Sequence, residues 1–250
     1  MIKYILIPLA LMLHFLSFGQ EEGSVNYKQV IQLKFDIQGN APVMMEKLPT
    51  ESASEFILLK KGNDVLYRNV VEGGQEDIHY ASGDGNEVQM DFRIQMPENI
   101  LYTNLAEGQF TEQTDFLGKK FLIQGPVKKQ AWKLTGKSKK VLDYACQEAI
   151  LQDSSQQVVA WFAPTIPWQI GPSKYHGLPG LILELHAGED RVIRAEEVSF
   201  DPVESAIEVP SKGKKVSPEE FEKIQDEKLK EIGATKGSGN TAIKMIIREN

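Results

Sequence analysis

Cysteine is almost absent from this chain of 250 residues, which contains Cys146 alone. A single thiol excludes an intrachain disulfide. Cys146 lies in an alternating apolar segment without a cationic or imidazole neighbour in the sequence, which favours a buried strand residue over a reactive thiol. Histidine is scarce as well, with four residues in the chain, so general bases and imidazole metal ligands are few.

The sequence also lacks the motifs of common hydrolases. No serine lies in a Gly-x-Ser-x-Gly turn, and there is no His-Glu-x-x-His segment. These absences favour a protein without enzymatic activity. A hydrolase built on paired carboxylates stays a third alternative, because acidic residues are plentiful and one sequence does not show which of them are neighbours in space.

Positive charge is in deficit, with 28 Lys and Arg against 35 Asp and Glu and a formal net charge of −7. Proteins that bind nucleic acid neutralise phosphates with clustered Lys and Arg. Nucleic acid is therefore not expected as a partner. We interpret the lysines between residues 119 and 140 as solvated edge and turn residues.

Long hydrophobic runs are missing after the N-terminus. Residues 4–16 are apolar, follow one lysine and precede the small residues Ser17 and Gly19. The run falls short of the roughly 20 residues that span a bilayer, and its flanks are typical of a secretory signal peptide. We predict a signal peptide over residues 1–19, no membrane span, and export to the periplasm or the outer-membrane face.

Alternating apolar and polar residues indicate β-strands in most of the remaining chain. The alternation is clearest at 31–37 and 88–94, and residues 55–60 and 64–70 are predicted to form a hairpin across Gly62. Further strands are predicted at 99–105, 108–116, 120–124, 131–134, 141–151, 157–163, 181–185 and 190–200. Residues 72–85 are expected to be a connection, and residues 135–138 a turn.

One helix is predicted near the C-terminus, at about 217–232. Ser217, Pro218 and Glu220 fit a capping box with proline in the first turn, and Gly233 is a stop signal. The predicted fold is mainly β: one domain over residues 20–250, with a curved antiparallel sheet or half-barrel and this C-terminal helix. Residues 233–250 are assigned to a spacer and a candidate last strand.

Proline and glycine are concentrated among aromatic residues at 160–186. Proline fixes φ and glycine permits positive φ, so this composition predicts one defined loop path. Five side chains of the stretch are candidates to line a groove for a hydrophobic, peptide or protein ligand: Trp161, Trp168, Tyr175, Leu178 and Pro179. The alternative is that the tryptophans fill the core and the glycines let the loop pass close to it.

The hexapeptide at 177–182, Gly-Leu-Pro-Gly-Leu-Ile, is the signature of the GLPGLI family, and the second half of the chain resembles that family. The structural motif positions that carry the resemblance are Tyr144, Cys146, Pro167, Gly171, Pro172, Gly177, Gly180, Leu181 and Ile182. Asp143 and Gln147 depart from it, because the family usually has glycine and a basic residue there. The resemblance implies a secreted β-rich protein of Bacteroidota-type bacteria without an established reaction.

A divalent-metal site is the alternative to the groove. Glu184 and His186 are two residues apart on a predicted strand and share a face, and His176 lies in the preceding loop. The other interpretation is that they form the half-exposed polar face of an antiparallel strand. Apart from such a metal, no cofactor is predicted.

The leading hypothesis from the sequence is an exported, non-enzymatic binding or assembly protein. Its partner would be a hydrophobic ligand or another protein of the cell envelope.

Overall fold

The structure is a computed structural model that describes residues 21–33, 50–70, 76–82, 88–94, 98–152, 157–204 and 206–231. For the two short stretches 76–82 and 88–94 the description is limited to the backbone. The predicted signal peptide, the predicted strand end at 34–37 and the assigned segment 233–250 lie outside the described residues.

Twelve strands form one sheet with two wings that meet at its centre. The first wing contains β1 (Glu22–Gln32), β2 (Glu51–Lys61), β3 (Asp64–Asn69), β6 (Asn99–Asn104), β7 (Gln109–Phe116), β8 (Lys119–Pro126) and β14 (Lys214–Val216). The second wing contains β9 (Trp132–Val141), β10 (Tyr144–Leu151), β11 (Val158–Ala163), β12 (Leu181–Ala187) and β13 (Arg191–Ser199). All neighbours pair antiparallel except β14 and β8, and β1 joins the wings by pairing with β13.

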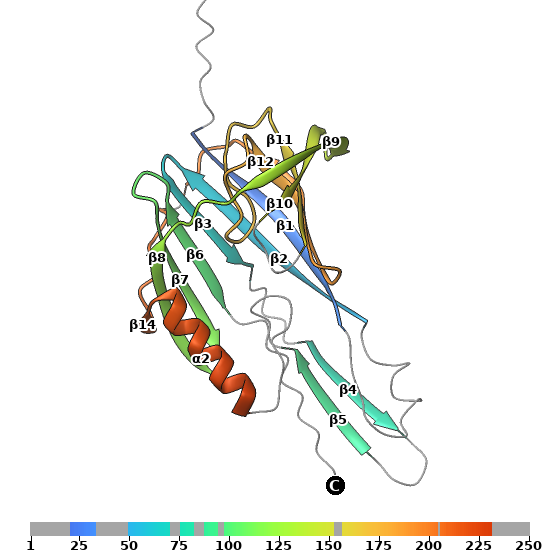
Figure 1. Cartoon of the computed structure of the whole chain (residues 1–250). Coiled ribbons are helices and arrows are strands. Elements are labelled where there is room, and N and C mark those ends of the chain that lie inside the picture. Colours follow the sequence, from blue (N-terminus) through green and yellow to red (C-terminus); the bar gives the residue numbers. More distant parts are fainter. Residues whose placement is uncertain are drawn as a thin grey trace, which may run out of the picture.

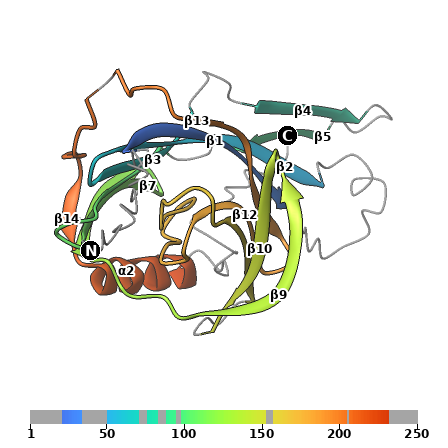
Figure 2. The same ribbon diagram turned by 90° about the horizontal axis from the view of Figure 1, so that it is seen from above.

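The sheet is strongly curved but not closed, because β14 and β9 are its free edges. Figure 2 shows it bending around an inner connection, with the helix α2 (Pro218–Glu231) on the open side. The predicted mainly β fold with a curved sheet and one C-terminal helix is confirmed. Two further strands, β4 (Glu76–Ser82) and β5 (Val88–Ile94), pair in a separate two-stranded sheet (Figure 1).

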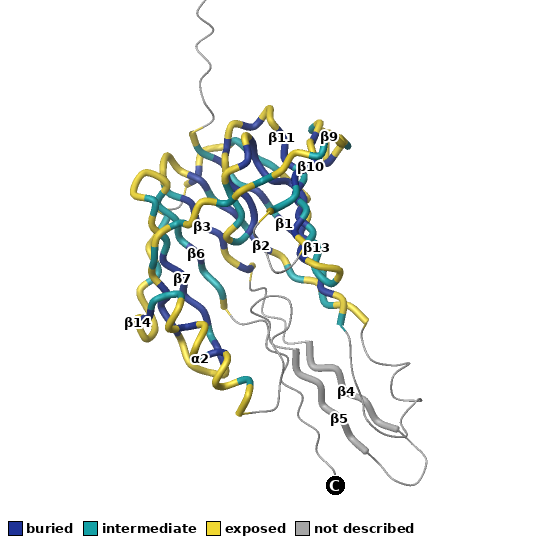
Figure 3. The backbone as a smooth tube through the Cα atoms, viewed as in Figure 1, coloured by how far each residue is buried: buried dark blue, intermediate teal, exposed yellow. Residues whose placement is uncertain are grey.

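Strand alternation directs apolar side chains to the inner face. In β1, Val25, Tyr27 and Ile31 are buried while Lys28 and Gln32 are exposed. The predicted hairpin is confirmed, since β2 pairs with β3 across a turn in which Gly62 has φ 57°. Buried residues gather where the two wings meet (Figure 3).

Three details of the predicted elements were wrong. The expected connection at 72–85 contains β4, and the expected turn at 135–138 lies inside β9, where Gly136 at φ 81° accompanies an irregular register with β10. Strand β14 was not predicted, because three residues are too short to show a period.

Helix α2 was predicted correctly to within a residue at each end. The Ser217 amide donates to Glu220 Oε2 at 2.7 Å, and the Glu220 amide donates to Ser217 Oγ at 3.2 Å, which completes the capping box. Phe221 packs on Phe116 and Phe121. Within the described part of the chain, no helix has the length and apolar character needed to cross a membrane.

The connection from β11 to β12, which we call the proline loop (residues 164–180), folds into the hollow of the curved sheet (Figure 2). Two backbone bonds hold it to β12, from the Leu181 amide to the Ile166 carbonyl and from the Ile182 amide to the Ile170 carbonyl. A Cβ atom at Gly171 would lie 2.6 Å from Ile182 Cβ, so this glycine permits the close approach.

Candidate binding pocket

A pocket of about 250 Å³ lies between the first wing and the proline loop. Inner-face residues of β3, β6 and β7 form one wall, and residues 170–176 of the proline loop form the other. The connection from β8 to β9 and Pro218 of α2 complete the lining. The walls are mainly apolar, which is typical of sites for hydrophobic groups.

Sheet register builds the first wall. Val65 pairs with Thr103, Thr103 pairs with Phe110, and Phe110 pairs with Gly125, so these four residues form one row across β3, β6, β7 and β8. A Cβ atom at Gly125 would lie 3.0 Å from Pro218 Cγ. The glycine therefore leaves room for the start of α2 to approach the sheet beside Phe110.

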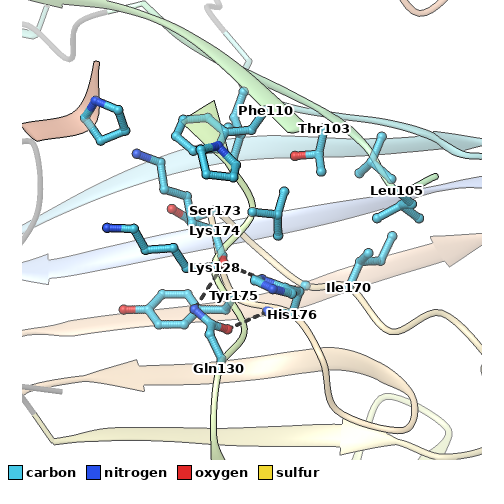
Figure 4. A pocket seen from close by; sticks show the side chains of 16 residues that line it. Thr103, Leu105, Phe110, Lys128, Gln130, Ile170, Ser173, Lys174, Tyr175 and His176 are labelled. Carbon is cyan, nitrogen blue, oxygen red and sulfur yellow. Dashed lines mark hydrogen bonds between the residues drawn. The ribbon is translucent and has the colours of Figure 1, made fainter. Parts of the chain in front are cut away.

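The proline loop supplies Ile170, Ser173, Tyr175 and His176 (Figure 4). Ser173 has φ 57°, a left-handed conformation that costs a non-glycine residue on the order of 1 kcal/mol and is often found at ligand-binding positions. Backbone hydrogen bonds of the proline loop hold Ser173 in this conformation.

Gln130 fixes the loop from the other side. Its side chain donates to the Lys174 carbonyl at 3.3 Å and accepts from the His176 amide at 2.9 Å, and Trp132 Nε1 donates to the His176 carbonyl at 2.8 Å. His176 Nδ1 lies 2.9 Å from the Lys174 carbonyl oxygen. Because a carbonyl only accepts, Nδ1 is the donor in this contact.

Both lysines of the pocket are paired with carboxylates. Lys174 Nζ lies 2.5 Å from Glu112 Oε2 and 5.1 Å from the centre of the Phe110 ring, and Lys128 Nζ lies 3.3 Å from Glu219 Oε1. Glu112 is buried on the inner face of β7, so its pair with Lys174 links the proline loop to the sheet. These pairs leave the immediate lining close to neutral.

Residues 152–184 match a family model. Its description is a protein of unknown function (Porph_ging), a domain associated with Bacteroidota, and the match includes the hexapeptide at 177–182. It covers the proline loop and the strands on either side of it, but less than half of the chain. A search of curated proteins gives no match.

The fold is similar to that of PNGF-II in two crystal forms. The P21 form has a TM-score of 0.52 and covers 82% of this chain, and the C2 form has a TM-score of 0.50 and covers 81%; both are 12% identical to it. The aligned part is 33% and 32% of the PNGF-II chain, so this chain spans about a third of that protein. At this identity the likeness shows the fold alone.

Of the five residues predicted to line a groove, Tyr175 alone lines the pocket. Trp168 and Leu178 are each 2% exposed and belong to the core, as the alternative interpretation had it. Trp161 is half-buried with Lys139 Nζ 4.4 Å from its ring centre, and Pro179 is exposed. The pocket is therefore lined mainly by residues other than these five.

Of the residues of the predicted metal site, Glu184 and His186 are in contact, whereas His176 belongs to the pocket lining. Within the described residues, no group of three or more His, Cys, Asp and Glu is arranged to hold a metal ion. The Glu184 carboxylate instead has three side-chain partners, of which two are cationic. The three partners are Lys139 at 2.6 Å, His186 at 2.5 Å and Arg194 at 2.9 Å. The expectation that Glu184 faces water was also wrong, since it is 2% exposed.

The motif residues Tyr144 and Cys146 are packing residues of β10. Cys146 is fully buried, and burial raises the pKa of its thiol to about 11. A thiol with such a pKa stays protonated near neutral pH and is a poor nucleophile.

Sequence reasoning missed the first wall of the pocket. Val65, Thr103 and Phe110 belong to ordinary alternating strands, and nothing in their local sequence distinguishes them from other inner-face residues. Their proximity to the proline loop comes from the curvature of the sheet. The one local signal was Gly125, because a glycine in a strand often marks a close approach.

Proposed function

We propose that this chain is an exported, non-enzymatic binding or assembly protein of the periplasm or outer-membrane face, and that it holds a hydrophobic group of its ligand in the pocket. We also infer that it belongs to the GLPGLI family, since the matched segment contains the hexapeptide and the Bacteroidota association agrees with the resemblance. The observation that carries the binding function is the apolar pocket between two rigid walls.

The size of the pocket supports a small hydrophobic group. An apolar cavity of about 150 Å³ accommodates benzene, while pockets for drug-sized ligands start near 300 Å³. A pocket of about 250 Å³ lies between these values. It suits one aromatic ring or a short alkyl chain, and a whole two-chain lipid exceeds it.

The rigidity of the pocket supports binding as well. Bonds from Gln130 and Trp132 and the pair of Lys174 with Glu112 hold the loop wall without a ligand. A preformed site loses less conformational entropy on binding than one that must be ordered first. The left-handed Ser173 is consistent with a wall shaped for an occupant.

The experiment that tests this function is octanol binding, followed by tryptophan fluorescence. Trp132 is a suitable reporter, because its ring centre lies 6.4 Å from that of Tyr175 in the lining. The Thr103→Phe variant fills the pocket from the sheet wall, and we expect it to abolish saturable octanol binding. The Thr165→Phe variant makes the same change at an exposed loop position and should bind like the wild type.

Unchanged octanol binding by Thr103→Phe, with both variants folded by circular dichroism, would show that the pocket is not the site. No saturable binding by the wild type would overturn the proposed function itself.

A further inference from the structure

A polar row lies directly next to the apolar row of the pocket wall. Tyr67 pairs with Leu101, and Leu101 pairs with Glu112, one step along the inner face from Val65, Thr103 and Phe110. Because alternate residues of a strand share a face, Tyr67 lies on the same side of β3 as the lining residue Val65. Leu101 lines the pocket itself. The margin of the pocket on this side therefore includes two polar side chains, Tyr67 and Glu112.

Tyr67 is 6% exposed, and its hydroxyl is buried without a hydrogen-bond partner among the described residues. Its ring stacks on Phe56 with centres 5.0 Å apart and meets Tyr27 edge-on, so the side chain is held firmly. An unpaired buried hydroxyl costs about 1–3 kcal/mol. Such a group is usually matched by water or by a ligand.

Arg191 reaches the same margin from the second wing. Its Nη2 donates to the hydroxyl of Tyr175, a lining residue, at 3.4 Å, and its Nε is buried and has no partner in the part of the chain that the structure describes. Burial raises the pKa of the Tyr67 phenol, and the Arg191 charge opposes this increase.

Arg191 differs from the other cations near the pocket in its ion pairing with the described residues. Lys174 and Lys128 are paired with Glu112 and Glu219, whereas no carboxylate of a described residue forms an ion pair with Arg191. Half-buried guanidinium groups are normally paired with an anion, since desolvation of an isolated charge is costly. A planar guanidinium is also well suited to two parallel bonds with a carboxylate.

We propose that Arg191, Tyr67 and Tyr175 bind the carboxylate of an amphipathic ligand whose apolar part occupies the pocket. The inference rests on the proposed function and deepens it by naming the chemical class, a monocarboxylate with a short apolar body. Arg191 Nε and the Tyr67 hydroxyl are the donors that such an oxygen pair would satisfy.

The test compares octanoate with octanol, which share the apolar chain and differ in the head group. We expect the wild type to bind octanoate more tightly than octanol. Arg191→Met keeps the aliphatic stem and should weaken octanoate binding by about tenfold or more, the usual effect of losing a charged hydrogen bond, while octanol binding stays within about twofold. Arg68→Met, on the exposed outer face of β3, is the matched control and should change neither.

Tyr67→Phe provides a second variant that keeps the packing. Because the hydroxyl forms no hydrogen bond with a described residue and its burial is unfavourable, we expect the thermal stability of the variant to equal or exceed the wild-type value while octanoate binding weakens several-fold. Equal affinity of the wild type for octanoate and octanol, or octanoate binding by Arg191→Met that matches the wild type, would overturn the carboxylate site. If the carboxylate site fails in this way but Thr103→Phe still abolishes octanol binding, the proposed function of the pocket is supported. The two proposals can therefore be tested separately.

Discussion

Glu184 shows how single residues of the second wing act together. Burial alone would raise the pKa of its carboxyl, but hydrogen bonds with three neighbours and the charge of Lys139 outweigh burial and lower the pKa to about 2. Those neighbours are Lys139, His186 and Arg194. The carboxylate thus ties β9, β12 and β13 together on the outer face of the sheet.

This pKa predicts how stability depends on pH. The folded value of about 2 is below the ordinary 4.5, so the stabilisation is complete above about pH 4.5 and is lost as the pH falls toward 2. Its full size is on the order of 3 kcal/mol. Urea unfolding of the wild type and of Glu184→Gln at several pH values measures it: we expect the variant to be less stable at pH 7, and the difference to shrink in acid.

The matched control is Glu196→Gln, on the exposed outer side of β13, which should follow the wild-type curve. A difference between the wild type and Glu184→Gln that stays constant from pH 7 to pH 2 would contradict the assigned role of the carboxylate.

At the scale of elements, α2 connects the end of the first wing to the pocket. Pro218 in its first turn lines the pocket, and Phe221 anchors the helix on β7 and β8. The capping box at Ser217 therefore determines where Pro218 lies.

We predict that Ser217→Ala lowers the free energy of unfolding by about 1 kcal/mol, because the Glu220 amide loses its acceptor. Octanol binding should weaken at the same time, since fraying moves Pro218 away from Phe110. Chemical unfolding and the fluorescence titration measure the two effects. Ser211→Ala, at an exposed position before β14, serves as the control, and an equal loss in that variant would show that the effect is not one of capping.

The elements also show where local pattern was sufficient. Alternation identified most strands, and the capping residues identified α2. The Gly- and Asp-rich composition around β4 concealed a strand, and Thr135-Gly136 resembled a turn although the chain continues through β9 with an irregular register. In both cases strand pairing outweighed local preference.

At the scale of the molecule, the sheet is organised around its earliest strand. β1 has hydrogen-bonded neighbours on both sides, and β12 is buried along nearly its whole length. The free edge β9 is largely exposed.

We predict that amide hydrogen exchange is slowest in β1, β12 and β13 and fastest among the sheet strands in β9. Central strands open only when much of the sheet unfolds, whereas an edge strand can open locally. Mass spectrometry of peptic fragments measures this order. Comparable protection of β9 and β1 would indicate a partner on the free edge or a different sheet order.

The sequence by itself determined the mainly β class, the C-terminal helix and a constrained loop at 164–180, because these follow from periodicity, capping and the limits that proline and glycine place on φ. Only the tertiary structure decided that Trp168 and Leu178 are core residues and that Glu184 pairs with Lys139 and Arg194. It also decided that Tyr175 lines the same pocket as Val65, Thr103 and Phe110. The physical reason is that the curvature of the sheet brings together residues that are far apart in the sequence. A local sequence pattern does not show which distant residues become neighbours.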